Sequence, residues 1–306
     1  NPYLDPLFDS AVLPDLKGRL AFTTDSYVVH PIFFPGGDIG KLAVCGTIND
    51  LAMAGAMPLY LTCGYILEEG LPLCDLERIV SSMAETAAQS GVMMVAGDTK
   101  VVPRGSADRI FINTAGIGLI PDEIDLKPNN VRPGVSIIFS GNMGDHGMAI
   151  LCQREGLEFD TPLTSDCTPL HKIVQVILAR YRSVRVMRDP TRGGLATTLV
   201  ELAEASGLGF ELDETLVPVN ESVRAACEIL GLDPFYLPNE GKFVLIADAG
   251  EADAIVAAIQ KHPVAKLARI IGRIVESHPR KVILKTAIGS KRVLDMSSVA
   301  QLPRIC

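Results

Sequence analysis

The chain has 306 residues, of which 48% are hydrophobic and 21% charged, a composition typical of a globular protein of about two domains. Its formal net charge of −8 excludes a basic surface of the kind that binds nucleic acid or an anionic membrane. No apolar run is long enough to span a bilayer, and the first residues, NPYLDPLFDS, lack the basic region of a signal peptide, so we expect a cytoplasmic protein.

Strands and helices are predicted to alternate in the first half of the chain. Four apolar, β-branched stretches predict buried strands: LAFTTDSYVV, LYLTCGYIL, VMMVAGD and IFINTAGIGLI. GTINDLAMAGAMP and CDLERIVSSMAETAAQSG predict helices, and the second has its apolar residues on one face and Gly91 at its end. The segment PDEIDLKPNNVRPG, rich in Pro, Asn and Asp, predicts a connection between two domains.

The second half repeats this mixture of strands and helices. Strands are predicted at VSIIFSG, KFVLIAD and LARIIGRIV, and helices at LHKIVQVILARY, LATTLVELAEAS and EADAIVAAIQKH. After about residue 290 the segment SKRVLDMSSVAQLPRIC loses its apolar periodicity. We therefore expect a mixed α/β fold with an N-terminal domain over residues 1–125, a C-terminal domain over residues 126–290 and a flexible tail over residues 291–306.

Four aspartates stand at informative places in these elements. Asp25 interrupts an apolar strand, Asp50 interrupts a helix of small residues, Asp98 ends the strand VMMVAGD, and Asp189 opens the turn RDPTRGG. Taken singly, each is typical of a cap or turn residue. Buried carboxylates must be paired or must bind a cation. Because no matching set of buried basic residues accompanies them, the four together predict a site for a hard cation such as Mg²⁺.

Glycine-rich turns lie close to these acids in the sequence. The turns FFPGGDIGK, GNMGDHG and TRGG allow the backbone to approach a phosphate, and the helices that follow them add attraction for anions. The first turn is not a P-loop, because Pro35 and Leu42 stand where that motif needs Gly and Ser or Thr. An ATP site in this chain must therefore differ from the P-loop, and no GxGxxG fingerprint occurs.

These motifs carry a resemblance to a known family. TTDSYVV, FFPGGDIGKLAVCGTINDLAMAGAMP, VAGDTKVV, GDHG, RDPTRGGLATTLVELAEAS and PNEGKFVL resemble the ATP-binding superfamily of aminoimidazole ribonucleotide synthetase, selenophosphate synthetase and thiamine monophosphate kinase. The ending PRIC is similar to the branch that matures nickel-iron hydrogenase. The resemblance implies a two-domain subunit, a homodimer formed through the N-terminal half, and ATP with Mg²⁺ between the domains. Superfamily members begin with a Gly-rich segment that covers the nucleotide phosphates, and this sequence starts after that point.

The resemblance also implies roles for individual residues. As metal ligands it implies Asp25, Asp50, Asp98 and Asp189. As residues near the nucleotide or its phosphates it implies Lys41, Asn49, Asp50, Gly144, Asp145, His146 and Arg192. A single histidine beside glycines is also typical of an ordinary turn, so His146 alone proves little.

For the last residue, Cys306, the resemblance implies that the thiol is both carrier and substrate. A partner carbamoyltransferase places a carbamoyl group on the sulfur, ATP phosphorylates the amide oxygen, and loss of phosphate and of the N–H proton leaves a thiocyanate. The cyano group then passes to iron-carrying scaffold proteins that assemble the hydrogenase cofactor. The tail alone also allows a simpler interpretation, an incidental cysteine on a disordered end.

The elimination needs a base for the N–H proton and a cation for the departing oxygen. Our candidates are Glu240 and Lys242 in PNEGK and Lys100 in GDTK. A partly desolvated Glu240 would have a raised pKa suited to proton transfer, although a solvated turn residue is the alternative. Lys100 either stabilises phosphate oxygens or assists deprotonation.

Two other classes of function fit parts of the sequence. A small-molecule kinase or synthetase of the same superfamily would need no terminal cysteine. A non-catalytic carrier of the carbamoyl or cyano group would bind ATP only as a structural or switching ligand. The terminal thiol argues against the first class, and the clustered acids argue against the second.

Overall fold

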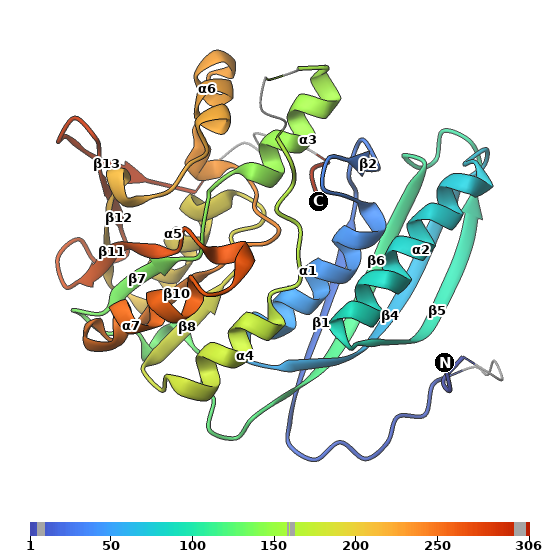
Figure 1. Cartoon of the computed structure of the whole chain (residues 1–306), viewed down its shortest axis with the longest axis horizontal. Helices are drawn as coiled ribbons and strands as arrows, with labels where there is room; N and C mark the ends of the chain where they lie inside the picture. The colour runs from blue at the N-terminus through green and yellow to red at the C-terminus, as the bar shows by residue number, and fades with distance from the viewer. Residues whose placement is uncertain (5–9, 158, 160–162, 297–303) are drawn as a thin grey trace.

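Two β-sheets, one in each half of the chain, organise the fold (Figure 1). The structure is a computed structural model that describes residues 1–4, 10–157, 159, 163–296 and 304–306. The first sheet has the order β1-β6-β4-β5, formed by β1 (Arg19–Tyr27), β6 (Ile110–Ile120), β4 (Met57–Glu68) and β5 (Met93–Val102). Within this first sheet, only β4 and β5 pair in parallel. The helix α2 (Leu73–Ser90) connects them and provides the crossover that a parallel pair needs.

The helix α1 (Ile39–Met53) lies between the first sheet and the second half of the chain. It follows the short strands β2 (Phe33–Phe34) and β3 (Gly37–Asp38), and the Asp38 side chain caps it by accepting two backbone N–H bonds. Nearly every side of α1 is buried, since it packs against α2, β1 and β6 and also against α4 and β8. A helix that is apolar all round is stable only in such a position.

The other face of the first sheet has no helix over it among the described residues. The Thr23 hydroxyl of β1 donates to Asp50 on α1, so this part of β1 turns its odd-numbered side chains to the helices. The alternation of a strand therefore turns Leu20 and Phe22 to the opposite face, where they are 56% and 70% exposed. We call this second surface the open face of the first sheet.

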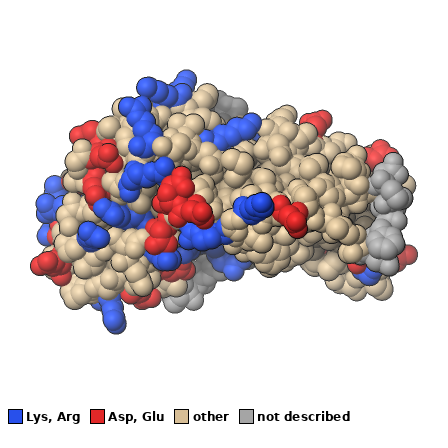
Figure 2. Space-filling model, turned by 90° about the horizontal axis from the view of Figure 1, so that it is seen from below, with Lys and Arg blue, Asp and Glu red and all other residues tan. Residues whose placement is uncertain are grey.

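The second sheet has seven strands in the order β13-β12-β9-β11-β7-β10-β8. The helix α5 packs against one face, and α4 and α7 cover the other face over β7, β10 and β8 (Figure 1). Seen from below, acidic and basic side chains intermingle over this half, whereas the first half shows few of them (Figure 2). The strands are β7 (Ser136–Phe139), β8 (Val184–Arg188), β9 (Gly209–Asp213), β10 (Val244–Ala247), β11 (Arg269–Val275), β12 (Val282–Lys285) and β13 (Lys291–Leu294).

The remaining elements complete the second half. No helix in the described part of the chain combines the length and hydropathy that a membrane crossing requires. The helices are α3 (Asp145–Glu155), α4 (His171–Arg180), α5 (Gly194–Ser206), α6 (Glu221–Leu230) and α7 (Ala249–Ile259). Short 3₁₀ helices occur at Pro128–Asn130, Glu214–Leu216, Pro234–Tyr236 and Pro263–Ala265.

The predicted mixed α/β class is confirmed, but the prediction of a flexible tail from residue 291 is wrong at its start. Residues 291–294 form β13, which pairs antiparallel with β12. Leu294 is buried in the hydrophobic core of the second half of the chain. One buried side chain in four residues is too weak a pattern to predict a strand from the sequence. Residues 297–303 of the predicted tail lie outside the described residues.

Candidate active site

The end of the chain lies between the two halves, close to α1 and β2 (Figure 1). The backbone N–H of Val28 donates to the Cys306 carbonyl (3.2 Å), so the end of the chain pairs with the segment after β1. The Cys306 thiol is near enough to Arg192 and Glu240 of the second half and to Asp25 of the first for their charges to affect it. Burial raises the pKa of this thiol to about 12, the Glu240 carboxyl adds to the rise, and Arg192 opposes it. The predicted residues Cys306, Glu240 and Arg192 therefore meet.

The backbone of Glu240 is held by two hydrogen bonds, whereas one oxygen of its side chain has no partner among the described residues. Its backbone N–H donates to Asp166 Oδ1 (3.0 Å), and its carbonyl accepts a bond from Asn49 Nδ2 (3.1 Å). The side chain is 3% exposed, and its Oε1 atom has no hydrogen-bond partner among the described residues. Burial raises the pKa of Glu240 well above its usual range, and Cys167 adds to the rise. A buried carboxyl group without a partner beside a thiol is available for proton transfer.

A buried ion pair between Lys242 and Asp166 supports the backbone of Glu240. Lys242 Nζ lies 3.1 Å from Asp166 Oδ2, and both side chains are almost completely buried. Although burial opposes its ionisation, the charge of Lys242 holds the pKa of Asp166 below its usual value. Asp166 is the most important residue that the sequence analysis missed. Its segment, LTSDCTPL, is mixed in polarity and contains no motif, so the only available signal was the lysine of PNEGK, which needs a counter-charge if it is buried.

Three of the four predicted metal ligands come together on the helical side of the first sheet. Asp25 comes from β1, Asp50 from the end of α1, and Asp189 from the turn after β8. Burial raises the pKa of Asp189 to about 7, and the charges of Asp50 and Asp25 contribute. Burial and Asp25 likewise raise the pKa of Asp50, against the hydrogen bond from Thr23. Such mutual repulsion is expected where carboxylates lie close together.

These carboxylates do not form a complete protein cage for a metal. Within the described residues, no three or more His, Cys, Asp or Glu side chains form a group that could hold a metal ion. Mg²⁺ commonly binds one or two carboxylates together with substrate phosphates and water. The donors present therefore fit Mg²⁺ delivered with a nucleotide rather than a permanently bound structural ion.

Asp98 and Lys100 do not join this site within one chain. Asp25 pairs with Thr114, which faces α1, whereas Asp98 pairs with Gly64 and points to the open face. Three strand spacings, about 14 Å, also separate β1 from β5. Lys100 and Asp98 instead form an exposed ion pair of 2.9 Å. Within one chain the structure therefore separates Asp98 from the other three aspartates, because sequence does not reveal which face of a sheet a strand residue takes, and the assignment of all four as metal ligands stays a prediction.

Asp98 and Lys100 line a hollow on the open face. The hollow has a volume of about 380 Å³, and Ser26 and Val28 from the end of β1 line its other side. Val28 is the residue whose N–H binds the Cys306 carbonyl. The open face and the site at the chain end therefore meet at Val28.

Asn49 and His146 were predicted to lie near nucleotide, and in the structure both have hydrogen-bond partners within the protein. Both amide protons of Asn49 are used, in bonds to the carbonyls of Glu240 and Thr168 (3.1 Å each), and its Oδ1 accepts from Leu170 N–H (2.8 Å). Asn49 therefore positions Glu240. The two ring nitrogens of His146 contact Ser165 Oγ (2.7 Å) and the Ile305 carbonyl (2.9 Å), so this ring contacts the chain end.

The predicted glycine turns serve packing as well as any ligand. Gly36 has φ +95°, and a Cβ there would lie 2.7 Å from the Ser165 carbonyl oxygen, while Lys41 Nζ donates to the Gly36 carbonyl (2.8 Å). The Gly144 N–H donates to Asn239 Oδ1 (2.8 Å). Asp145 has a buried oxygen without a partner among the described residues, and burial raises its pKa to about 6.

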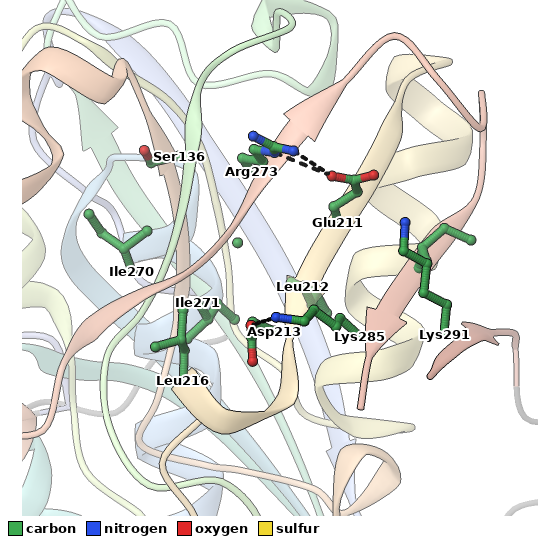
Figure 3. A pocket seen from close by; sticks show the side chains of 12 residues that line it. Ser136, Glu211, Leu212, Asp213, Leu216, Ile270, Ile271, Arg273, Lys285 and Lys291 are labelled. Carbon is green, nitrogen blue, oxygen red and sulfur yellow. Dashed lines mark hydrogen bonds and ion pairs between the residues drawn. The ribbon is translucent and has the colours of Figure 1, made fainter. Parts of the chain in front are cut away.

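A larger hollow of about 460 Å³ lies elsewhere, on the part of the second sheet that α4 and α7 leave uncovered (Figure 3). Most of its charges are already paired, as Arg273 lies 3.0 Å from Glu211 and Lys285 lies 3.1 Å from Asp213. None of the predicted site residues lines it. The candidate active site is therefore the junction of the two halves.

Comparison with known proteins agrees with this division. The N-terminal domain of AIR synthase related protein matches residues 8–120, and its C-terminal domain matches residues 132–285. The chain belongs to the AIR synthase related family. The two matches meet at the connection between the sheets, so the family's domains are the two halves described above.

Within the family, the chain is 55% identical over 288 residues to Carbamoyl dehydratase HypE of Cupriavidus necator, covering 94% of this chain and 82% of that protein. A crystal structure of hydrogenase maturation protein HypE in complex with ATP has a TM-score of 0.96 and 50% identity, covering 100% of this chain and 92% of that one. A crystal structure of a HypE-HypF complex has a TM-score of 0.88 and 47% sequence identity, covering 97% of this chain and 95% of that one.

Proposed function

We propose that this protein is an ATP-dependent carbamoyl dehydratase that acts on a carbamoyl group carried by its own Cys306. The observation that carries the proposal is the buried terminal thiol, which is within electrostatic reach of Arg192, Asp25 and Glu240, whose Oε1 has no hydrogen-bond partner among the described residues. The name Carbamoyl dehydratase HypE, given to a relative 55% identical to this chain, supports it.

The reaction balances as two steps. The oxygen of S–C(=O)–NH₂ attacks the terminal phosphate of ATP and releases ADP, which turns that oxygen into a phosphate leaving group. One N–H proton is lost as the phosphorylated imidate S–C(=NH)–OPO₃ forms, and loss of the second N–H proton then expels phosphate and leaves S–C≡N. We assign the proton transfer to Glu240, because its buried carboxyl lies beside the sulfur that carries the group. Asn49 and Asp166 hold its backbone in place.

We infer that Asp25, Asp50 and Asp189 bind Mg²⁺ together with the nucleotide phosphates. Burial raises the pKa values of Asp189 and Asp50, and neighbouring carboxylates add a repulsion that a cation would relieve. Carboxylate oxygens are also the ligands that Mg²⁺ prefers. When bound, the ion neutralises charge on the transferred phosphate. The glycine turns, with Lys41, Gly144 and Asp145, are proposed to lie near the nucleotide. The ATP complex of a HypE at 50% identity supports a nucleotide site.

We propose that Asp98 and Lys100 serve the active site of a second subunit. Both point to the open face, where Phe22, Leu20 and Ile66 present apolar side chains to solvent. Exposed apolar surface of this extent on a sheet favours burial against a partner, which supports a homodimer formed through the N-terminal half. Lys100 of one subunit would then stabilise the departing phosphate on the tail of the other.

We further propose two kinds of partner protein. A carbamoyltransferase loads Cys306, which is supported by the solved HypE-HypF complex. Iron-carrying scaffold proteins of nickel-iron hydrogenase maturation accept the cyano group, because a thiocyanate is a store of cyanide that requires an acceptor. A cytoplasmic location stays a prediction from the sequence.

Intact mass spectrometry tests the proposal. The full-length protein is carbamoylated by the partner enzyme and then incubated with or without Mg²⁺ and ATP. We expect the carbamoyl adduct to lose one water only with ATP, and Cys306→Ala to show no adduct. An adduct that persists with ATP would instead indicate a carrier. The absence of any adduct would indicate a kinase or synthetase with a free substrate.

A further inference from the structure

The last three residues are held mainly through their backbone. The His30 N–H donates to the Arg304 carbonyl (3.1 Å), and the Val28 N–H donates to the Cys306 carbonyl (3.2 Å). Two backbone hydrogen bonds, two residues apart on each segment, therefore attach the chain end to the segment that follows β1. Ile305 lies between these two bonded residues and is 3% exposed. Its side chain packs in the hydrophobic core of the first half of the chain.

The carbonyl of Ile305 accepts a hydrogen bond from a buried histidine. His146 Nε2 lies 2.9 Å from this oxygen, and the ring stands edge-on to Phe34 with 5.6 Å between ring centres. Burial lowers the pKa of His146, so the ring is neutral and carries a single N–H. A neutral ring can donate to Ile305 only if that proton is on Nε2.

Ser165 determines that tautomer. The Cys167 N–H donates to Ser165 Oγ (3.1 Å), and the hydroxyl is 2.7 Å from His146 Nδ1. Because Nδ1 of this tautomer has only a lone pair, the Ser165 hydroxyl donates its proton to it. The chain of donors therefore runs from Cys167 N–H through Ser165 and His146 to the Ile305 carbonyl. Removing the chain end would leave a buried N–H without its partner.

We propose that His146 and Ser165 form a latch that binds the Ile305 main-chain carbonyl and holds Cys306 in the inward position against Glu240. This inference deepens the proposed function and rests on it. His146 and Ser165 are positioning residues, since neither contacts the thiol. The latch recognises a backbone group, so its action does not depend on the group that the sulfur carries, and the free, carbamoylated and cyanated forms of the tail are all held.

The other contacts of the chain end are more exposed. Arg304 forms an ion pair with Asp108 (2.6 Å) in which both side chains are partly open to solvent, and surface pairs contribute little. Arg154 donates to the carbonyls of His30 and Arg304 (2.8 and 2.7 Å). We expect the loss of these partly exposed contacts to release the tail less than the loss of the buried hydrogen bond to the Ile305 carbonyl.

Accessibility of the tail tests the latch without any ATP chemistry. The rate at which iodoacetamide alkylates Cys306 is followed by peptide mass spectrometry, with the exposed Cys74 as reference in the same protein. Trypsin cleavage after Arg304, which releases Ile-Cys, gives a second measure. Ser165→Ala and His146→Asn should raise both rates at least about ten-fold, the effect of one lost buried hydrogen bond.

Matched variants separate the latch from a general loss of structure. The amide nitrogen of Gln reaches the position of His Nε2, so His146→Gln should keep most of the protection that His146→Asn loses. Arg304→Ala removes only the exposed ion pair and should change the alkylation rate less than about three-fold. Ile305→Glu, at the last residue but one, should release the tail without unfolding the protein.

The same variants connect the latch to the reaction. In Ser165→Ala and His146→Asn, carbamoylation by the partner should be unchanged or faster, whereas the ATP-dependent loss of water should slow in proportion to tail release. Equal tail protection in wild type, His146→Asn and Ile305→Glu would overturn the latch. Release of the tail by these variants in a protein that never dehydrates its carbamoyl group would support the latch and reject the proposed function.

Discussion

Glu240 is surrounded by groups that oppose its ionisation. Burial is the largest of these effects on its pKa, followed by Cys167 and the carboxylates Asp189, Asp166 and Asp25. A base must have lost its proton before it can accept one, so a raised pKa shifts the active form to higher pH. Binding of a cation at the aspartates would lower that pKa again and link proton transfer to nucleotide binding.

Glu240→Gln should abolish proton transfer and leave loading intact. We expect the single-turnover rate of dehydration to fall by about 10² to 10⁴, because the amide has the same shape and no basic oxygen. In the wild type this rate should rise with pH through the raised pKa of Glu240 and then level off. Rapid-quench mass spectrometry from pH 5 to 9 measures both effects. A rate independent of pH in the wild type, or a Gln variant of normal rate, would show that another group is the base.

Asn49 connects α1 to two segments of the second half, and its loss should affect stability. Asn49→Ala leaves the carbonyls of Glu240 and Thr168 and the N–H of Leu170 without their partner. We expect the free energy of unfolding to fall by about 2–4 kcal/mol, measured by urea denaturation. Lys41→Ala, which removes one bond to the Gly36 carbonyl, is the control and should cost less than about 1 kcal/mol. Equal losses in the two variants would contradict the structural role of Asn49.

At the scale of elements, α1 determines where the site lies. Its burial on all sides lets it pack against both sheets, so Asp50 at its C-terminal end meets Asp25 from one half and Asp189 from the other. Small residues make this packing close, as a Cβ at Gly40 would lie 2.6 Å from the Ile79 carbonyl oxygen. The site is therefore a property of the contact between the halves.

The open face of the first sheet makes a prediction about assembly. Phe22→Glu places a charge among the exposed apolar side chains of this face, which we expect to shift the proposed dimer toward monomer by at least about ten-fold in dissociation constant. Sedimentation velocity over a range of concentrations measures the change. Ile229→Glu, on α6 of the second half and 75% exposed, is the matched control and should leave the dimer intact. A Phe22→Glu dimer of unchanged affinity would contradict this interface.

The sequence predicted elements better than it predicted partners in space. The long apolar strands and α2 are where their periodicity placed them, since burial and period are local properties. The strand β13 was missed because only Leu294 marks its buried side. The role of Asp98 depends on the face of the sheet to which its side chain points, and the role of His146 depends on a chain end 160 residues away. Local sequence patterns contain neither kind of information.

At the scale of the whole molecule, two residues that we assign to one reaction, Glu240 and Lys100, lie apart within one chain, because Lys100 points to the open face. Glu240 lies beside Cys306 of its own chain, whereas Lys100 points away from it, three strands distant from β1. If both residues act on the same carbamoyl group, Lys100 must come from the partner subunit. Each active site then contains residues from two chains, and dimer formation becomes a condition for activity.

Hybrid dimers test this arrangement. Lys100→Ala and Glu240→Gln should each be inactive alone, and mixing them after dissociation forms hybrids in which one site has both Glu240 and the partner's Lys100. We expect recovery of about a quarter of the wild-type dehydration, because half of the dimers are hybrids and each has one complete site. Mass spectrometry should find the dehydrated Cys306 only on the Lys100→Ala chains, which retain Glu240. If Lys100 acted within its own chain, every site would lack one residue and mixing would restore nothing.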